Sequence, residues 1–180
     1  MRIRPDGLAS GVRFIASPNC DERPAGVAIE LLVIHAISLP PGQFGGPGIE
    51  QLFLNRLDPA QDPYYVGIAG LRVSAHFLVR RCGTMLQFVS CTRRAWHAGA
   101  SSWRGRSGCN DFSIGIELEG TDELQFEPLQ YESLARVTRA LQVAYPIIDI
   151  VGHSDVAPGR KSDPGPHFDW ARYRSSIERR

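Results

Sequence analysis

The hydrophobic pattern alternates between short apolar runs typical of strands and longer periodic segments typical of helices. Residues 27–34 are rich in β-branched residues and Leu and indicate a buried strand. In residues 113–119, three apolar residues alternate with polar residues and Gly. This alternation predicts a strand with one apolar face and one face that carries two carboxylates. Further strands are expected over residues 74–81, 84–91 and 147–151, the first two joined by a tight turn at Cys82-Gly83.

Three segments show helical spacing. Leu134, Val137 and Leu141 fall on one stripe of residues 129–145, which predicts an amphipathic helix. Shorter helices are expected over residues 50–57 and 168–177, and the loop at 38–48 has the Pro and Gly content of a functional loop. Strands and helices mix without strict alternation, so we predict a single α/β domain with a mixed central β-sheet flanked by helices.

Composition narrows the possible partners. The chain has 180 residues, of which 43% are hydrophobic and 22% charged, as in ordinary globular domains. Lys and Arg number 20 against 19 Asp and Glu, a balance that argues against a nucleic-acid binder with a large cationic surface. The longest apolar stretch is too short to cross a bilayer. We therefore expect neither a nucleic acid nor a membrane as partner.

The N-terminal residues and the cysteines bear on the cellular compartment. Residues 1–7 include two Arg but no apolar run follows them, so we expect no secretory signal. The four cysteines, Cys20, Cys82, Cys91 and Cys109, form no CxxC pair. Scattered thiols of this kind fit a reducing compartment, and the prediction is a cytoplasmic protein with four free thiols.

Three residues have the chemistry of a metal site. His35 and His153 each follow an apolar strand segment, where a side chain reaches a cleft while the sheet holds its backbone. Asp163 precedes Pro164, which restricts the backbone of the aspartate. Two imidazoles and one carboxylate make a zinc set with a fourth position for water. The alternatives are that each histidine is an ordinary hydrogen-bonded residue and that Asp163 only begins a turn.

Charged residues near this set suggest hydrolysis. Lys161 lies two residues before Asp163, where a cation suits an oxyanion that develops during reaction; its alternative is a solvated loop charge. A carboxylate on the strand at 113–119 suits proton transfer from water. Glu117 and Glu119 share one face of that strand, and the pattern does not choose between them.

Seven segments in order carry a family resemblance, namely residues 34–35, 37–47, 72–76, 94–99, 109–120, 152–153 and 161–166. Together they resemble the type 2 N-acetylmuramoyl-L-alanine amidases, most of all the branch that recycles 1,6-anhydro-muropeptides. The resemblance extends from about Ser17 to Trp170. It implies one zinc amidase domain over residues 1–180, with a core at about 17–170 and the zinc site at the loop end of the sheet.

The resemblance also implies roles for individual residues. His35, His153 and Asp163 would bind one Zn²⁺ per chain, Glu117 would be the catalytic carboxylate, and Lys161 would stabilise the transition state, leaving Glu119 a structural role. The reaction implied is cleavage of the amide between the lactyl group of muramic acid and L-alanine. The expected protein is a cytoplasmic monomer that acts on a small muropeptide and thereby limits β-lactamase induction.

Three further residues are assigned to substrate binding through the resemblance: Arg72, Ala95 and His97. For Arg72, which suits the carboxylates of a stem peptide, the alternative is a surface ion pair. For His97, the alternative is a hydrogen bond to a metal ligand from behind. Trp96 fits the cleft wall and the core equally well.

The sequence departs from the family at Ala36, Gly108 and Ser154, of which Ser154 is a small change, and other function classes stay open. Ala36 stands where the family usually has Asn after the first zinc histidine, and Gly108 stands where relatives often have Arg. One alternative is a wall-lytic amidase or endolysin, which would normally bring a signal, a wall-binding module or a basic surface. The other is a non-catalytic peptidoglycan-recognition module, which typically lacks a zinc ligand.

Overall fold

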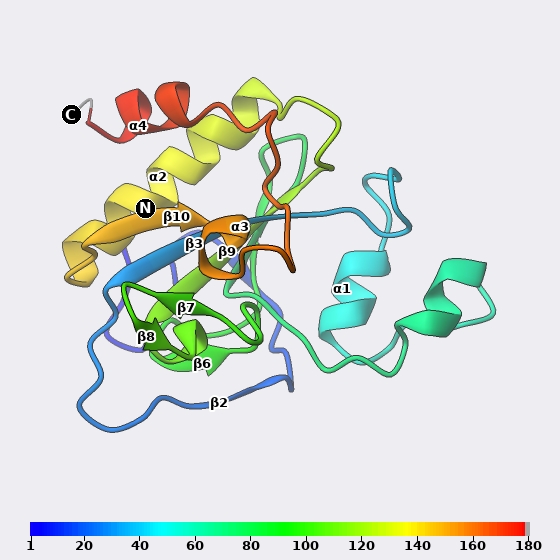
Figure 1. The fold of residues 1–180 in the computed structure, drawn as a ribbon, viewed down its shortest axis with the longest axis horizontal. Helices are drawn as coiled ribbons and strands as arrows, with labels where there is room; N and C mark the ends of the chain where they lie inside the picture. The colour runs from blue at the N-terminus through cyan, green and yellow to red at the C-terminus, as the bar shows by residue number, and fades with distance from the viewer. Residues whose placement is uncertain (179–180) are drawn as a thin grey trace.

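A computed structural model describes residues 1–178 of the chain (Figure 1). Its strands are β1 (Arg13–Phe14), β2 (Cys20–Glu22), β3 (Leu31–Ile37), β4 (Phe77–Val79), β5 (Met85–Gln87), β6 (Arg93–Ala95), β7 (Ser102–Trp103), β8 (Arg106–Ser107), β9 (Ser113–Glu119) and β10 (Asp149–Gly152). Its helices are α1 (Gly48–Phe53), α2 (Pro128–Ala144), α3 (His153–Val156) and α4 (Trp170–Glu178), with short 3₁₀ turns at Pro63–Gly67 and Cys109–Asp111.

A six-stranded sheet forms the centre, in the order β1-β5-β4-β9-β3-β10. The β4–β5 pair is antiparallel and every other neighbouring pair in this sheet is parallel. Two small sheets, β2-β6 and β7-β8, lie outside it. The prediction of a mixed central sheet flanked by helices is confirmed.

The predicted elements differ from the structure mainly at their ends. β9 has the predicted bounds, and α2 differs by one residue at each end. The predicted strand over residues 27–34 was wrong at both ends, because parallel pairing with β9 begins at Leu31 and continues to Ile37. His35 therefore lies inside β3 rather than after it. The hairpin turn is confirmed, with Gly83 at a φ of 81°, but β4 and β5 are shorter than expected.

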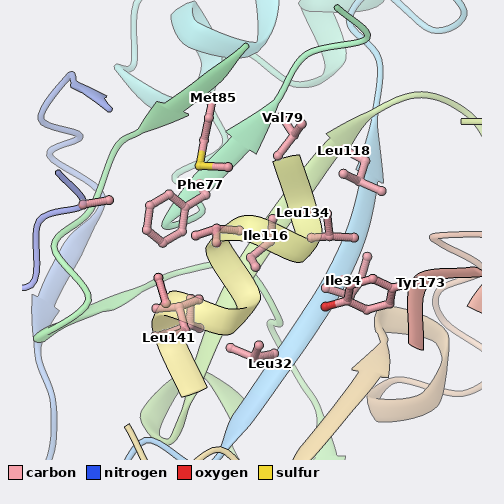
Figure 2. Packing of buried hydrophobic residues seen from close by; sticks show 14 of the residues in the cluster. Leu32, Ile34, Phe77, Val79, Met85, Ile116, Leu118, Leu134, Leu141 and Tyr173 are labelled. Carbon is pink, nitrogen blue, oxygen red and sulfur yellow. The ribbon is translucent and has the colours of Figure 1, made fainter. Parts of the chain in front are cut away.

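Helices α2 and α4 cover one face of the sheet, and β6, β7 and β8 lie on the other side (Figure 1). Leu134 and Leu141 of α2 point toward Leu32 and Ile116 of the sheet (Figure 2). Tyr173 of α4 is fully buried in the same cluster. The predicted inner face of α2 is thus confirmed.

The second face of β9 is buried as well. It carries Ser113, Gly115, Glu117 and Glu119, and loop segments cover it rather than solvent. Two of these residues are glutamates, Glu117 at 9% and Glu119 at 2% exposure. Their hydrogen-bond partners therefore indicate what each carboxylate does. Polar groups this deep need hydrogen bonds or a functional reason to lack them.

Two smaller findings complete the fold. All four cysteines are free. Among the helices within residues 1–178, none combines the length and apolarity needed to cross a membrane.

Truncating Leu134 to Ala tests the packing of α2. We expect a loss of about 2–5 kcal/mol in the free energy of unfolding, because a fully buried Leu leaves a cavity. Val143→Ala on the same helix is the matched control, since Val143 is 89% exposed and its truncation should change stability by at most about 0.5 kcal/mol. Urea unfolding measures both, and equal effects would contradict the packing described.

Candidate active site

Strand pairing brings the first site residues together. β3 pairs with β9 so that His35 lies opposite Glu117. β10 pairs with β3 so that Gly152 lies opposite Ile34, and His153 follows as the first residue of α3. Asp163 comes from the loop after α3, and its backbone oxygen accepts a 2.9 Å hydrogen bond from the amide of Ser154.

His35, His153 and Asp163 converge on one point. The two Nδ1 atoms are 3.0 Å apart, and Asp163 Oδ2 lies 3.0 Å from Nδ1 of His153 and 3.3 Å from Nδ1 of His35. In a tetrahedral zinc site with bonds near 2.0–2.1 Å, ligand atoms are roughly 3.3 Å apart. Among residues 1–178, this is the one cluster of three metal-ligand side chains whose donor atoms all lie within 4.8 Å of one another.

The Nε2 atoms of His35 and His153, which point away from the cluster, have hydrogen-bond partners. Nε2 of His153 lies 3.3 Å from the carbonyl oxygen of Ala98, and Nε2 of His35 lies 2.9 Å from Nδ1 of His97. Metal-ligating histidines usually donate their other N–H to such a partner, which orients the ring. The two Nδ1 atoms and one carboxylate oxygen are therefore a donor set that fits zinc.

A cavity of about 540 Å³ opens onto this cluster and is also lined by Glu117, Lys161, Trp96 and His97. Oε2 of Glu117 is buried and has no hydrogen-bond partner in the described part of the chain. Buried carboxylate oxygens nearly always have a hydrogen-bond partner. Oε2 of Glu117 is therefore available to a molecule that enters the cavity. Lys161 is exposed at the rim.

Burial and charge shift the ionisation of the site. Burial, reinforced by the negative charge of Asp163, raises the pKa of Glu117 well above its usual range, while Lys161 opposes the rise. Burial lowers the pKa of His35 to about 4, so its ring is neutral at physiological pH. Burial disfavours ionised Asp163, but hydrogen bonds with His153 and His35 outweigh it and lower the pKa of this carboxyl. Neutral imidazoles and an ionised aspartate are the forms that bind metal.

Glu119 has different surroundings from Glu117. Its carboxylate accepts hydrogen bonds from Nη1 of Arg80 at 2.8 Å, the amide of Gly45 at 2.7 Å and the amide of Arg81 at 3.2 Å. These contacts tie the Pro/Gly loop to the sheet. The sequence pattern did not distinguish the two carboxylates, but their contacts do. Glu119 is saturated with hydrogen bonds, and Glu117 faces the cavity.

Of the three residues predicted to bind substrate, only His97 lines the cavity. Its ring is buried between His35 and Ser113, whose Oγ lies 3.1 Å from its Nε2. Arg72 is exposed and donates to the carbonyl oxygens of Gly70 and Leu71. Ala95 is fully buried in the core. The structure gives neither Arg72 nor Ala95 a side-chain contact with the cavity.

Two residues for which no role was predicted, Asn110 and Ser113, also hold the site. Oδ1 of Asn110 accepts hydrogen bonds from the amides of His97 at 3.1 Å and Ala98 at 2.8 Å. Ser113 supports the ring of His97. Both residues lie in the segment 109–120 that carried the family resemblance, but their spacing gave no signal of these contacts.

Comparisons with known proteins agree with this geometry. The family model described as N-acetylmuramoyl-L-alanine amidase matches residues 25–166. The 1,6-anhydro-N-acetylmuramyl-L-alanine amidase AmpD of Citrobacter freundii is 55% identical over 96% of this chain and 93% of its own length.

Solved structures are similar as well. A crystal structure of a Se-Met AmpD derivative has a TM-score of 0.96 and 54% identity over 98% of this chain and 99% of its own. The amidase AmiD from E. coli, in complex with the substrate anhydro-N-acetylmuramic acid-L-Ala-D-gamma-Glu-L-Lys, has a TM-score of 0.61 and 29% identity over 94% of this chain and 60% of its own.

Replacing Glu117 by Gln tests the unpaired carboxylate. Because the folded-state pKa is raised, the folded protein holds this proton more tightly than the unfolded chain. In chelator-treated protein, the stability associated with Glu117 is therefore full below its ordinary pKa of 4.5 and is lost as the pH rises through the raised value. Denaturant unfolding from pH 5 to pH 8 should show Glu117→Gln increasingly more stable than the parent.

Glu132→Gln, at an exposed position of α2, is the control for this measurement. Its stability should follow that of the parent at every pH. A Glu117→Gln variant that also follows the parent would contradict the buried, unpaired state of this carboxylate.

Proposed function

Because the chain belongs to the N-acetylmuramoyl-L-alanine amidase family, we propose that it hydrolyses the amide between 1,6-anhydro-N-acetylmuramic acid and L-alanine in muropeptides. The single observation that carries the proposal is the convergence of His35, His153 and Asp163 beside the unpaired carboxylate of Glu117. The anhydro sugar is proposed from the name of the AmpD relatives and the ligand bound to AmiD.

The proposal includes one zinc ion per chain, held by His35, His153 and Asp163. Bound there, zinc would supply a Lewis acid for the scissile carbonyl and a positive charge that favours ionised Glu117. The donor distances and the paired outward nitrogens of both histidines support this assignment.

Glu117 is assigned the proton transfers. Its free Oε2 accepts a proton from the attacking water as the water oxygen bonds to the lactyl carbonyl carbon. When the tetrahedral intermediate collapses and the C–N bond breaks, Glu117 returns this proton to the departing nitrogen of L-alanine. The Glu117 carboxylate ends the cycle as it began, and the products are the lactyl carboxylic acid, which keeps the second proton of the water until it ionises in solvent, and the free amino group of the peptide.

Lys161 is assigned the stabilisation of charge. The carbonyl oxygen gains negative charge as water adds, and the ammonium group of Lys161 at the cavity rim would interact favourably with it. Because Lys161 is exposed, its side chain is available to a substrate that enters from solvent.

The finer parts of the proposal concern cellular context. We infer a monomeric cytoplasmic enzyme of peptidoglycan recycling that limits β-lactamase induction by removing muropeptides, and the resemblance to the recycling branch supports this. The near-balance of charge supports a small-molecule substrate rather than nucleic acid. The second candidate, a wall-lytic amidase, is distinguished by its preference for polymeric wall.

Substitutions of Glu117 and Lys161 test the division of roles. Glu117→Gln should reduce kcat/KM by about 10²–10⁴-fold, as expected for loss of a general base. Lys161→Met should reduce kcat by about 10²–10³-fold, as expected for loss of one oxyanion partner. Both variants should retain zinc, measured by elemental analysis alongside turnover.

Glu119→Gln is the comparison for these variants, since Glu119 contacts Arg80 and the loop rather than the cavity. It should lower stability while affecting turnover per folded, zinc-loaded molecule far less. An inactive Glu119→Gln together with an active Glu117→Gln would reverse the assignment of the catalytic carboxylate.

Substrate preference is tested by mass spectrometry of the products. Zinc-loaded protein should convert anhydro-muropeptide to anhydro-N-acetylmuramic acid and free peptide much faster than it releases peptides from purified sacculi. Faster release from sacculi would favour the wall-lytic function. No turnover of either substrate by zinc-loaded protein would favour a recognition module.

A further inference from the structure

We propose that His97 is a positioning residue that sets the ring orientation and tautomer of His35, so that Nδ1 of His35 faces the metal. This inference rests on the proposed zinc site and assigns His97 a role other than the substrate contact expected from the resemblance. Its basis is the set of contacts around the His97 ring and backbone.

The ring of His97 is held at both nitrogens. Nδ1 lies 2.9 Å from Nε2 of His35, and Nε2 lies 3.1 Å from Oγ of Ser113. The rings of His35 and His97 meet edge to face, with centroids 5.0 Å apart and an interplanar angle of 87°. With both nitrogens engaged inside the protein, the His97 ring has no free polar atom for a substrate.

The protons on the hydrogen-bonded series His35, His97 and Ser113 can be arranged in two ways. In the first, Nε2–H of His35 donates to His97, and Nε2–H of His97 donates to the hydroxyl of Ser113. In the second, Ser113 donates to His97, Nδ1–H of His97 donates to His35, and the His35 proton lies on Nδ1. Only the first leaves a lone pair on Nδ1 of His35, which faces His153 and Asp163. Ser113 permits it because a hydroxyl accepts as well as donates.

Gly115 creates the space that the His97 ring occupies. A Cβ atom on Gly115 would lie 2.4 Å from Cγ and 2.5 Å from Nδ1 of His97, which is closer than nonbonded atoms approach. Gly115 lies in the middle of β9, where glycine weakens a strand unless another group needs close approach. Here the group that approaches is the His97 ring.

The backbone next to His97 orients the second histidine ligand. The carbonyl oxygen of Ala98 lies 3.3 Å from Nε2 of His153 and also accepts a 2.6 Å hydrogen bond from Nη2 of Arg160. Asn110 fixes this dipeptide by accepting from both of its amides. The segment His97-Ala98 thus contacts both imidazole ligands on the side away from the metal site. The His97 ring contacts His35, and the carbonyl of Ala98 contacts His153.

The test compares zinc affinity in three variants, measured by competition with a chelating dye. His97→Phe keeps a planar ring but removes both nitrogens, and should weaken zinc binding by about 10–100-fold. His97→Asn places an amide oxygen near the position of Nδ1, accepts from His35, and should recover most of the affinity. His167→Phe, at an exposed histidine, is the matched control and should bind zinc like the parent.

A spectroscopic readout separates positioning from general loss of structure. Long-range ¹H–¹⁵N NMR of the zinc-loaded parent should show His35 protonated at Nε2 and His97 unprotonated at Nδ1. This measurement needs no variant, so it decides the matter even if His97→Phe does not fold. A zinc-loaded parent in which His35 binds through Nε2, or His97 carries its proton on Nδ1, would overturn the proposal.

Two outcomes separate this inference from the proposed function. If His97→Phe folds, binds zinc like the parent and only raises KM, then His97 is a substrate contact and the positioning role is wrong while the amidase stands. If the parent itself binds no zinc, the proposed zinc site is wrong and the inference falls with it.

Discussion

The parallel pairing of β3 with β9 is the constraint on which the site depends. This pairing places His35 beside Glu117 on one face of the sheet, while Leu32 and Ile116 pack under α2 on the other. If the strand β3 slipped by one residue, its two faces would be exchanged. His35 would then be buried under α2, and apolar side chains would face the cavity. The hydrophobic core therefore specifies the polar geometry on the opposite face.

Burial of that polar face then separates groups that are chemically alike. Glu117 and Glu119 come from one strand and point to the same side, yet Glu119 is saturated by Arg80 and loop amides. Glu117 keeps a free oxygen beside Asp163 and has a raised pKa because burial disfavours its charge. Within residues 1–178 no hydrogen bond reaches Oε2 of Glu117, so this is the carboxylate to which we assign the proton transfers.

The sequence predicted the parts of the fold that depend on local periodicity. β9 and α2 were placed to within a residue because alternation and the 3.6-residue stripe are strong signals. The end of β3 was misplaced because it is fixed by a partner strand about 80 residues away, which no local pattern records. The short strands β6, β7 and β8 carry too few residues for any periodicity.

The candidate site was predictable to a similar extent. His35, His153 and Asp163 were singled out from residue type, the predicted strand ends near the two histidines, the proline after Asp163 and the resemblance, and the structure brings them together. The support from Ser113 and Asn110 was not found, since it depends on space that a glycine leaves and on contacts across the fold.

Zinc stoichiometry decides whether His35, His153 and Asp163 form one metal site. The measurement is mass-spectrometric metal analysis of chelator-stripped protein reloaded with zinc and freed of excess, for the parent and for Asp163→Ala. We expect one zinc per parent chain and almost none in a folded Asp163→Ala variant. Equal zinc content in the two proteins, or none in the parent, would contradict it.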